Sequence, residues 1–199
     1  MRFDLEKIAS FVLPGSTVLD LGCGDGDLLS YLEREIGVTG TGIEKSETKV
    51  AHCIERGLSV LQGDINKEVL DYPDGAFDYV ILSRTLQQVY DPAGLIRSLL
   101  RVGKRGIVSF PNFGHWRVRM QLLGTGYAPV TRQLPYEWYD TPNIRVITLK
   151  DFRKFSKDVG FRILKMAAII SDFNGMDGHT VIFMPNLRAT YGIFLIEKG

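Results

Sequence analysis

The stretch VLDLGCGDGDLL, Val18–Leu29, decides the fold. It begins with the apolar residues of a buried strand, and Gly22, Gly24 and Gly26 then follow at every second position. After the third glycine the sequence restarts as a helix. Glycines in such a strand-to-helix turn let the backbone approach a ligand closely. The stretch therefore predicts an α/β protein with a nucleotide-like ligand at the end of its first strand.

The acidic residues of this loop argue against ligands that carry phosphates. The dinucleotide-binding pattern G-x-G-x-x-G has a third glycine where Asp27 stands, and Asp25 and Asp27 would repel a diphosphate. A Walker-type loop needs Gly-Lys-Ser/Thr, which does not follow here. S-adenosyl-L-methionine has an adenosine body, a sulfonium and an α-amino group, and it has no phosphate. The loop predicts this cofactor or its demethylated product, S-adenosyl-L-homocysteine.

The ends of the next strands carry residues that suit the same ligand. Glu44 ends the second strand, twenty residues after Gly24, where an acid accepts from both ribose hydroxyls. Asp64 and Ile65 end the third strand, where they suit the adenine amino group and ring, although Asp64 also suits a helix cap. Asp20 is expected to orient the loop and the ligand's amino group. The predicted cofactor-binding residues are Asp20, Gly22, Cys23, Gly24, Gly26, Glu44, Lys45, Asp64, Ile65, Leu82 and Ser83.

Strands and helices alternate along the chain, which favours a doubly wound, mostly parallel α/β sheet in a single domain, residues 1–199. Ser46 is expected to cap one helix that Gly57 ends, and a Thr148-x-x-Asp151 box to open another. The expected helices are 4–13, 27–35, 46–57, 92–102 and 148–161. The expected strands are 17–22, 40–44, 58–64, 77–83 and 106–112, with β-rich segments at 162–170 and 191–197.

Composition excludes several other classes of protein. The 199 residues are 45% hydrophobic with a net charge of +1, which gives no electrostatic case for nucleic acid or an anionic membrane as a partner. No apolar run reaches the roughly 20 residues of a membrane span, and the first residues lack a signal peptide's apolar centre, so we expect a cytoplasmic protein. The two cysteines and three dispersed histidines predict neither a disulfide framework nor a metal site.

The motifs VLDLGCGDG, GTGIE, GDI and FDYVILS together resemble class I S-adenosylmethionine-dependent methyltransferases over residues 15–112. The later blocks RTLQQVYDP, LLRVGKRGIVSFPNFGHWRVRMQLL, PVTRQLPYEWYDTPNI and MPNLRATYGIFLI resemble the MetW family of methionine biosynthesis. The resemblance implies a Rossmann-like methyltransferase sheet with an antiparallel C-terminal edge. The sequence departs from the family pattern at Arg84, where glutamine is usual, and at Arg145, where histidine is common.

The resemblance implies a function that the cofactor motifs alone do not. Proteins of the MetW family are associated with homoserine O-acyltransferase, which implies an accessory, activating partner of that enzyme. The alternative is an active small-molecule methyltransferase, which needs a general base near the cofactor. The candidates for that base are His115, Tyr127, Tyr136 and Tyr139, although His115 also suits the start of a helix.

The segment 113–144 is expected to be either a substrate lid or an interface with the partner. Aromatic and arginine side chains are enriched at interface centres, and they also suit a lid. The side chains on which this expectation rests are Phe113, Trp116, Arg117, Arg119, Tyr127, Arg132, Tyr136, Trp138 and Tyr139.

Overall fold

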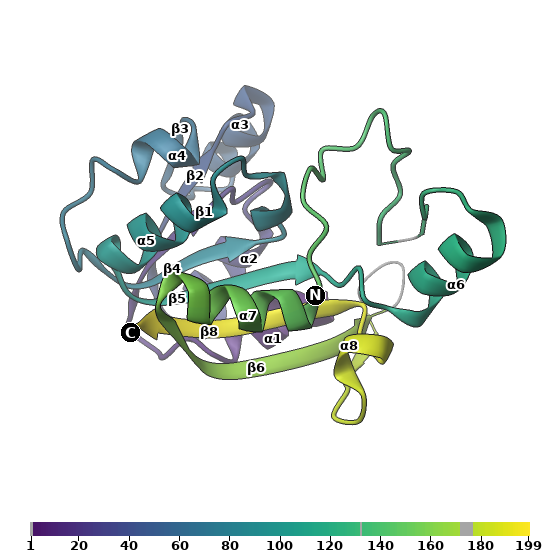
Figure 1. The fold of residues 1–199 in the computed structure, drawn as a ribbon. Helices are drawn as coiled ribbons and strands as arrows, with labels where there is room; N and C mark the ends of the chain where they lie inside the picture. Colours follow the sequence, from purple (N-terminus) through teal and green to yellow (C-terminus); the bar gives the residue numbers. More distant parts are fainter. Residues whose placement is uncertain (1, 132, 172–176) are drawn as a thin grey trace.

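The computed structural model describes residues 2–131, 133–171 and 177–199 (Figure 1). Within them, eight strands form one sheet in the order β3-β2-β1-β4-β5-β8-β6-β7. The strands are β1 (Thr17–Leu21), β2 (Thr39–Glu44), β3 (Val60–Gln62), β4 (Phe77–Ser83), β5 (Gly103–Pro111), β6 (Phe161–Ser171), β7 (Gly178–Thr180) and β8 (Tyr191–Lys198).

The sheet has a parallel half and an antiparallel half. Strands β1 to β5 pair in parallel, with β1 between β2 and β4, so the order reverses beside β1. The carboxyl ends of parallel strands at such a switch point form a ligand crevice. Strand β8 pairs antiparallel with β5 and β6, and β7 pairs antiparallel with β6. The prediction of a doubly wound, mostly parallel sheet with an antiparallel C-terminal edge is confirmed.

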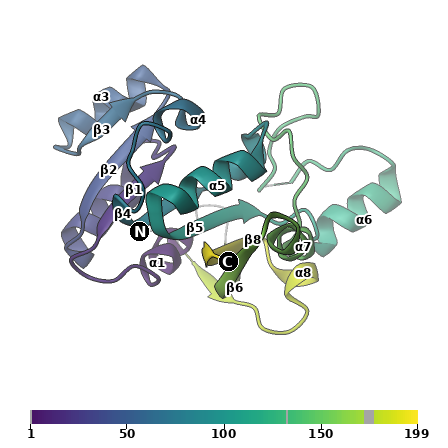
Figure 2. The same cartoon turned by 60° about the vertical axis from the view of Figure 1, so that its left-hand side comes forward.

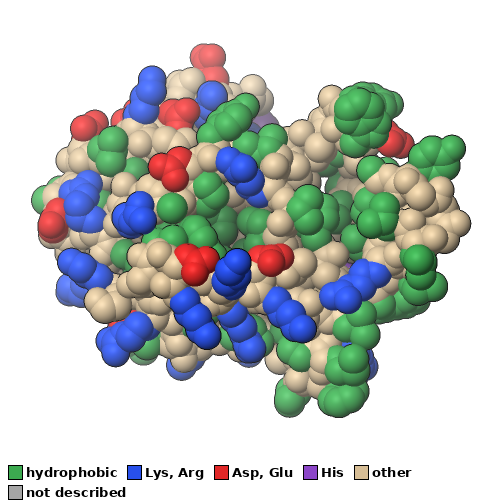
Figure 3. Space-filling view, viewed as in Figure 1, with side chains coloured by type: hydrophobic (Ala, Val, Ile, Leu, Met, Phe, Trp, Pro, Cys, Tyr) green, Lys and Arg blue, Asp and Glu red, His purple; other side chains and the backbone are tan. Residues whose placement is uncertain are grey.

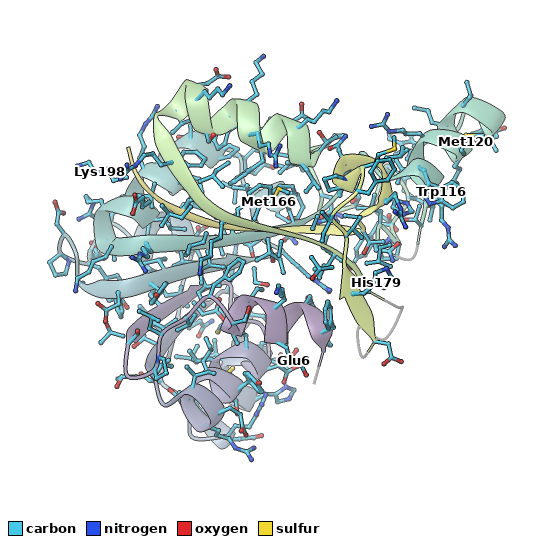
Figure 4. The ribbon with its side chains drawn as sticks, turned by 90° about the horizontal axis from the view of Figure 1, so that it is seen from below. Glu6, Trp116, Met120, Met166, His179 and Lys198 are labelled. Atoms are coloured by element: carbon cyan, nitrogen blue, oxygen red, sulfur yellow. The ribbon has the colours of Figure 1, made fainter. Side chains whose placement is uncertain are left out.

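Helices cover both faces of the sheet. The helices are α1 (Phe3–Ala9), α2 (Asp27–Tyr31) with a π-turn (Leu32–Ile36), α3 (Glu47–Glu55), α4 (Ile65–Glu68), the 3₁₀ turn η2 (Leu86–Gln88), α5 (Pro92–Val102), α6 (Trp116–Thr125), α7 (Leu149–Val159) and α8 (Pro185–Arg188). One core packs α5 and α7 on the sheet, and a second packs α1 and α2 on its other face. Figures 2 and 4 show α7 and α1 on opposite sides of the sheet.

The cap predictions were partly right. Thr148 and Asp151 form a capping box at the start of α7, as predicted. Gly57, with φ +77°, follows the end of α3, as predicted. Ser46 occupies the N-cap position of α3, as predicted, but its side chain makes no capping hydrogen bond; its backbone N–H donates to Glu44 Oε1 at 2.9 Å.

Several expected boundaries were also wrong. Helix α1 ends at Ala9 rather than at residue 13, and tighter three-residue turns continue to Val12 because Pro14 disfavours helix in the residue before it. Strand β3 starts later than expected, since the N–H of Leu58 is still bonded to the Cys53 carbonyl of α3. Strand β5 starts earlier than expected, because its pairing with β4 already begins at Gly103, opposite Phe77.

The segment between β5 and α7 extends beyond the carboxyl edge of the sheet, at the right of Figure 1. It contains α6 and, after it, an irregular chain with one isolated bridge between Thr131 and Leu134. Arg132, named above, lies outside the described residues. In the part of the chain that the structure describes, no helix is long and apolar enough to cross a membrane.

Candidate functional site

A cavity of about 570 Å³ lies at the carboxyl ends of β1 to β4. The glycine loop after β1 forms one wall, and residues that follow β2, β3 and β4 form the others. Nine of the eleven predicted cofactor residues line it: Asp20, Gly22, Cys23, Gly24, Glu44, Lys45, Asp64, Ile65 and Ser83. The structure thus brings residues from four strand ends together at one place, and their binding of a cofactor stays a prediction.

The two remaining residues have other surroundings. Leu82 is fully buried in the core against α5, and it is not among the described residues that line the cavity. Gly26 is also absent from that lining; it has φ +76° and precedes α2. A Cβ on Gly26 would lie 2.4 Å from Leu58 Cδ1 and 2.9 Å from Cys53 Sγ. This glycine is therefore required for packing against the end of α3.

The glycine loop is fixed in place by its neighbours. Gly22 has φ +77°, and a Cβ there would lie 2.9 Å from Thr85 Oγ1. The N–H groups of Gly22 and Cys23 both donate to the Ile43 carbonyl, at 2.7 and 3.1 Å. Gly24 also has a positive φ, and no atom lies within 4 Å of the position of its Cβ. The loop is thus anchored to β2 while its middle glycine faces open space.

Glu44 joins this loop to the end of β2. Its Oε2 accepts from Gly24 N–H and its Oε1 from Ser46 N–H, both at 2.9 Å. A carboxylate oxygen has two lone pairs, so each oxygen keeps capacity for a further donor. Glu44 lines the cavity, and its position suits a pair of ribose hydroxyls.

Asp20 is the most unusual group of the site. Its side chain is only 1% exposed, and its Oδ1 has no hydrogen-bond partner among the described residues. Burial, and secondarily the charge of Glu44, raises the pKa of Asp20 to about 7. A buried carboxylate oxygen without a donor is destabilising. A cationic ligand group against Oδ1 would satisfy it, so the residues present fit a ligand with an ammonium group.

Asp64 forms the helix cap that the sequence had left open as an alternative, and it also lies in the cavity lining. Its Oδ1 accepts from Asn66 N–H at 2.9 Å and caps α4. This hydrogen bond holds the pKa of Asp64 below its usual value. The same side chain lines the cavity next to Ile65.

The surroundings of Cys23 and His115 do not favour a catalytic role for either side chain. Burial raises the pKa of the Cys23 thiol well above its usual value, so it is protonated at neutral pH. His115 lies in a separate hollow of about 480 Å³, and its Nδ1 accepts from Arg117 N–H at the start of α6. Burial, with the charge of Arg117, lowers the pKa of His115. Neither His115 nor the candidate bases Tyr127, Tyr136 and Tyr139 belongs to the described lining of the main cavity.

Sequence reasoning missed part of the cavity wall. Arg2 and Leu5 come from the first helix and its start, where no motif marks them. Arg84 directly follows β4, and only its departure from the family pattern drew attention to it. Arg145 lies outside the lining but donates to the carbonyls of Val89 and Tyr90, which are part of it.

The model of the family described as methionine biosynthesis protein MetW matches residues 2–196. The chain belongs to this family. It is 35% identical over 162 residues to the bifunctional methionine biosynthesis protein MetXA/MetW of Rhodopirellula baltica, covering 77% of this chain and 26% of that protein. It is 30% identical to a ubiquinone biosynthesis O-methyltransferase of Methylococcus capsulatus, over 79% of this chain and 68% of the relative. The chain thus spans about a quarter of the length of its MetXA/MetW relative.

Solved structures share the fold at low identity. An S-adenosylmethionine-dependent methyltransferase from Archaeoglobus fulgidus superposes with a TM-score of 0.71 at 17% identity, covering 98% of this chain and 91% of that one. One from Thermotoga maritima, described as a possible histamine N-methyltransferase, gives 0.69 at 16% identity, covering 98% and 87%. These similarities show that this chain has the fold of these methyltransferases.

The raised pKa of Asp20 predicts a pH-dependent stability that the Asp20→Asn variant lacks. The folded pKa of about 7 lies above the unfolded value near 3.9, so the folded state binds more protons between these pH values. The free energy of unfolding of the wild type therefore falls as the pH rises through this window. At pH 8 we expect Asp20→Asn to be more stable by about 2–4 kcal/mol, a gap that closes towards pH 4.

Urea unfolding of both proteins across this pH range measures the effect. Asp71→Asn, at an exposed aspartate away from the cavity, is the matched control and should follow the wild type. Parallel pH profiles for Asp20→Asn and the wild type would show that Asp20 ionises normally.

Proposed function

We propose that the cavity binds S-adenosyl-L-methionine or S-adenosyl-L-homocysteine. The observation that supports this most directly is Oδ1 of buried Asp20 beside the glycine loop, for which the described part of the chain offers no hydrogen-bond partner. Asp20 would face the ligand's ammonium group, Glu44 its ribose, and Asp64 with Ile65 its adenine. When bound, S-adenosylmethionine supplies an electrophilic methyl group on its sulfonium. The residues of this chain hold and orient that ligand.

We propose further that the protein acts in the cytoplasm as an accessory, activating partner of homoserine O-acyltransferase. The relative in which MetXA and MetW are named together as one bifunctional protein supports a physical association between the two activities. The cofactor then serves as a signal of the pathway's end product, bound next to the partner surface. This role requires a surface for the partner as well as the cavity.

The segment 113–144, with the residues that follow it, offers such a surface. Ten of its large apolar side chains are exposed, more than half of those exposed in the described residues. Figure 3 shows hydrophobic side chains gathered on the right-hand side, and Figure 4 places Trp116 and Met120 away from the sheet. The ten are Trp116, Met120, Leu122, Leu123, Tyr127, Tyr136, Trp138, Tyr139, Ile144 and Val146. Exposed apolar side chains gathered in one region suit a protein partner.

Arg145 connects this segment to the cavity. Its backbone N–H donates to the Gln87 carbonyl at 3.0 Å, and its guanidinium donates to the carbonyls of Val89 and Tyr90. Gln88, Val89 and Tyr90 line the cavity. A ligand that shifts this wall would therefore also act on the end of the proposed partner surface.

The alternative function, methyl transfer to a small molecule, has support in the match to a ubiquinone biosynthesis O-methyltransferase. Transfer to oxygen requires that a base remove the acceptor's proton. His115, the leading candidate, caps α6 from a separate hollow. This placement favours the accessory role.

The Glu44→Ala variant tests the cofactor site. It removes the acceptor for both ribose hydroxyls, and it should weaken S-adenosylmethionine binding by about 1.5–3 kcal/mol, the range for hydrogen bonds to a charged group. Glu44→Gln keeps one carbonyl acceptor and should lose less. Isothermal titration calorimetry measures both. Glu47→Ala, at an exposed acid outside the cavity lining, is the control. Unchanged affinity in Glu44→Ala would remove this residue from the site.

The Trp138→Ala variant tests the partner role. Trp138 is 75% exposed, and its ring contacts Tyr139 edge-on with centroids 5.7 Å apart. Truncating an aromatic residue at an interface centre costs about 2 kcal/mol. We expect a weaker complex with homoserine O-acyltransferase and less activation of acyl transfer, with S-adenosylmethionine affinity unchanged. Co-purification and an acylation assay with and without this protein measure both.

Ile54→Ala, at an exposed apolar residue of α3, is the control for this experiment and should behave as the wild type. An intact complex and intact activation in Trp138→Ala would count against the interface. An acyltransferase that is fully active alone and forms no complex would refute the accessory role. Reduced turnover of a methyl acceptor in Trp138→Ala would instead identify the segment as a lid.

A further inference from the structure

A groove of about 340 Å³ lies outside the main cavity, where residues of α6, α7, α8 and β6 meet. Its lining combines apolar and basic side chains, and none of the described residues that line it is acidic. The apolar ones are Leu149, Met166, Met184, Pro185 and Leu187. The basic ones are Arg119, Lys150 and Arg153. This combination suits a ligand that is both apolar and negatively charged.

The three basic side chains of the groove have no acid to neutralise them. All three are exposed, and within the described residues no ion pair involves Arg119, Lys150 or Arg153. Nε of Arg119 donates to a backbone carbonyl before α6 at 2.8 Å, and Nη2 of Arg153 lies 3.4 Å from Met166 Sδ. Asp151, the nearest acid along α7, is occupied in the capping box. The groove therefore presents uncompensated positive charge.

The groove is held open by contacts of Asn186 on α8. The side-chain oxygen of Asn186 accepts from Lys150 N–H at 3.1 Å, which ties α8 to the start of α7. Its backbone carbonyl accepts from Asn112 Nδ2 at 3.0 Å, which ties α8 to the end of β5. A Cβ on Gly114 would lie 2.8 Å from the same carbonyl oxygen, so the chain before α6 also packs closely here. A groove that is formed before binding costs its partner little ordering.

An exposed apolar turn, residues 182–184, adjoins the groove. Ile182 is 90% exposed and Phe183 is 69% exposed, and Met184, the third residue, is part of the groove lining. The turn is anchored at both ends. Val181 N–H donates to the Ala168 carbonyl at 2.7 Å, and the Met184 carbonyl accepts from two N–H groups of α8 at 2.9 and 3.1 Å. Three successive apolar side chains on an anchored turn are typical of a surface that binds a protein.

The basic charge extends from the groove along α7. Lys150, Arg153, Lys154 and Lys157 are exposed and recur at intervals of three or four residues, so they share one face of the helix. Figure 3 shows Lys and Arg side chains in a row across the lower half of the molecule, over α7. The row ends beside hydrophobic side chains at the lower right, next to α8. A partner segment with acidic and apolar side chains matches this surface in both charge and polarity.

We propose that this groove docks an acidic segment of homoserine O-acyltransferase. Carboxylates of that segment pair with Lys150 and Arg153, and its apolar side chains pack on the 182–184 turn. The proposal rests on the proposed accessory role and adds the chemistry of the partner's docking segment. Arg119 belongs both to the groove and to the segment 113–144, so the groove is continuous with the proposed partner surface.

Charge reversal in the groove tests the proposal on the complex of the full chain with purified homoserine O-acyltransferase. At about 50 mM salt, Arg153→Glu should bind the enzyme about tenfold more weakly than the wild type. At about 500 mM salt, screening should reduce this difference to less than about threefold. Arg97→Glu is the matched control, because Arg97 is also an exposed arginine in the middle of an eleven-residue helix and lies outside the groove lining. It should stay within about twofold of the wild type at both salt concentrations.

The apolar turn is tested separately by Phe183→Ala. This variant should weaken the complex about tenfold at both salt concentrations, since the lost contact is apolar. Ile54→Ala, at an exposed apolar residue of α3, is its control and should bind as the wild type does. Affinity for S-adenosylmethionine should be unchanged in all four variants, because none of the four residues lines the main cavity.

The outcomes separate this proposal from the one on which it rests. A wild-type complex that Arg153→Glu weakens no more than Arg97→Glu does would overturn the groove and leave the accessory role intact. No complex with the wild type would refute the accessory role, and the docking of this enzyme with it. A dimer of the protein alone that Arg153→Glu disrupts would overturn the proposal by showing that a second copy of the chain occupies the groove.

Discussion

The turn at the end of β1 is the constraint on which the rest of the site depends. Gly22 must take a left-handed conformation against Thr85, where a Cβ would lie 2.9 Å from its hydroxyl oxygen. The Ile43 carbonyl of β2 then holds the loop through two N–H groups, and Glu44 holds Gly24. This closure places the loop over the switch point of the sheet and leaves Asp20 buried beneath it.

The sequence predicted this part well because its signals are local. Apolar strands, glycines and acids at strand ends determine where Asp20, Gly24 and Glu44 lie, since parallel strands end at one edge. Leu82 lies in the core rather than in the described cavity lining, because the pattern of the strand does not show which of its faces meets the core. Arg2 had no signal at all, because its place beside Arg84 depends on how α1 packs across the sheet.

In the proposed function, the two halves of the chain have different roles, one for the ligand and one for the partner. Residues at the ends of β1 to β4 form a cavity whose lining does not identify a methyl acceptor. The segment after β5 carries more than half of the large apolar side chains that are exposed in the described residues. Arg145 joins the two through the wall of the cavity. A methyltransferase fold with an exposed apolar surface beside its cavity suits the proposed role, in which the protein reports the cofactor level to a partner enzyme.

Proton release on binding tests most directly whether Asp20 is the counter-ion of a cationic ligand. At about pH 6.5 much of Asp20 is protonated, because its pKa is raised to about 7, and an ammonium group against it would drive ionisation. Calorimetry of S-adenosylmethionine binding in two buffers of different ionisation enthalpy should show proton release that is absent in Asp20→Asn. Equal binding heats in both buffers for the wild type would contradict the account.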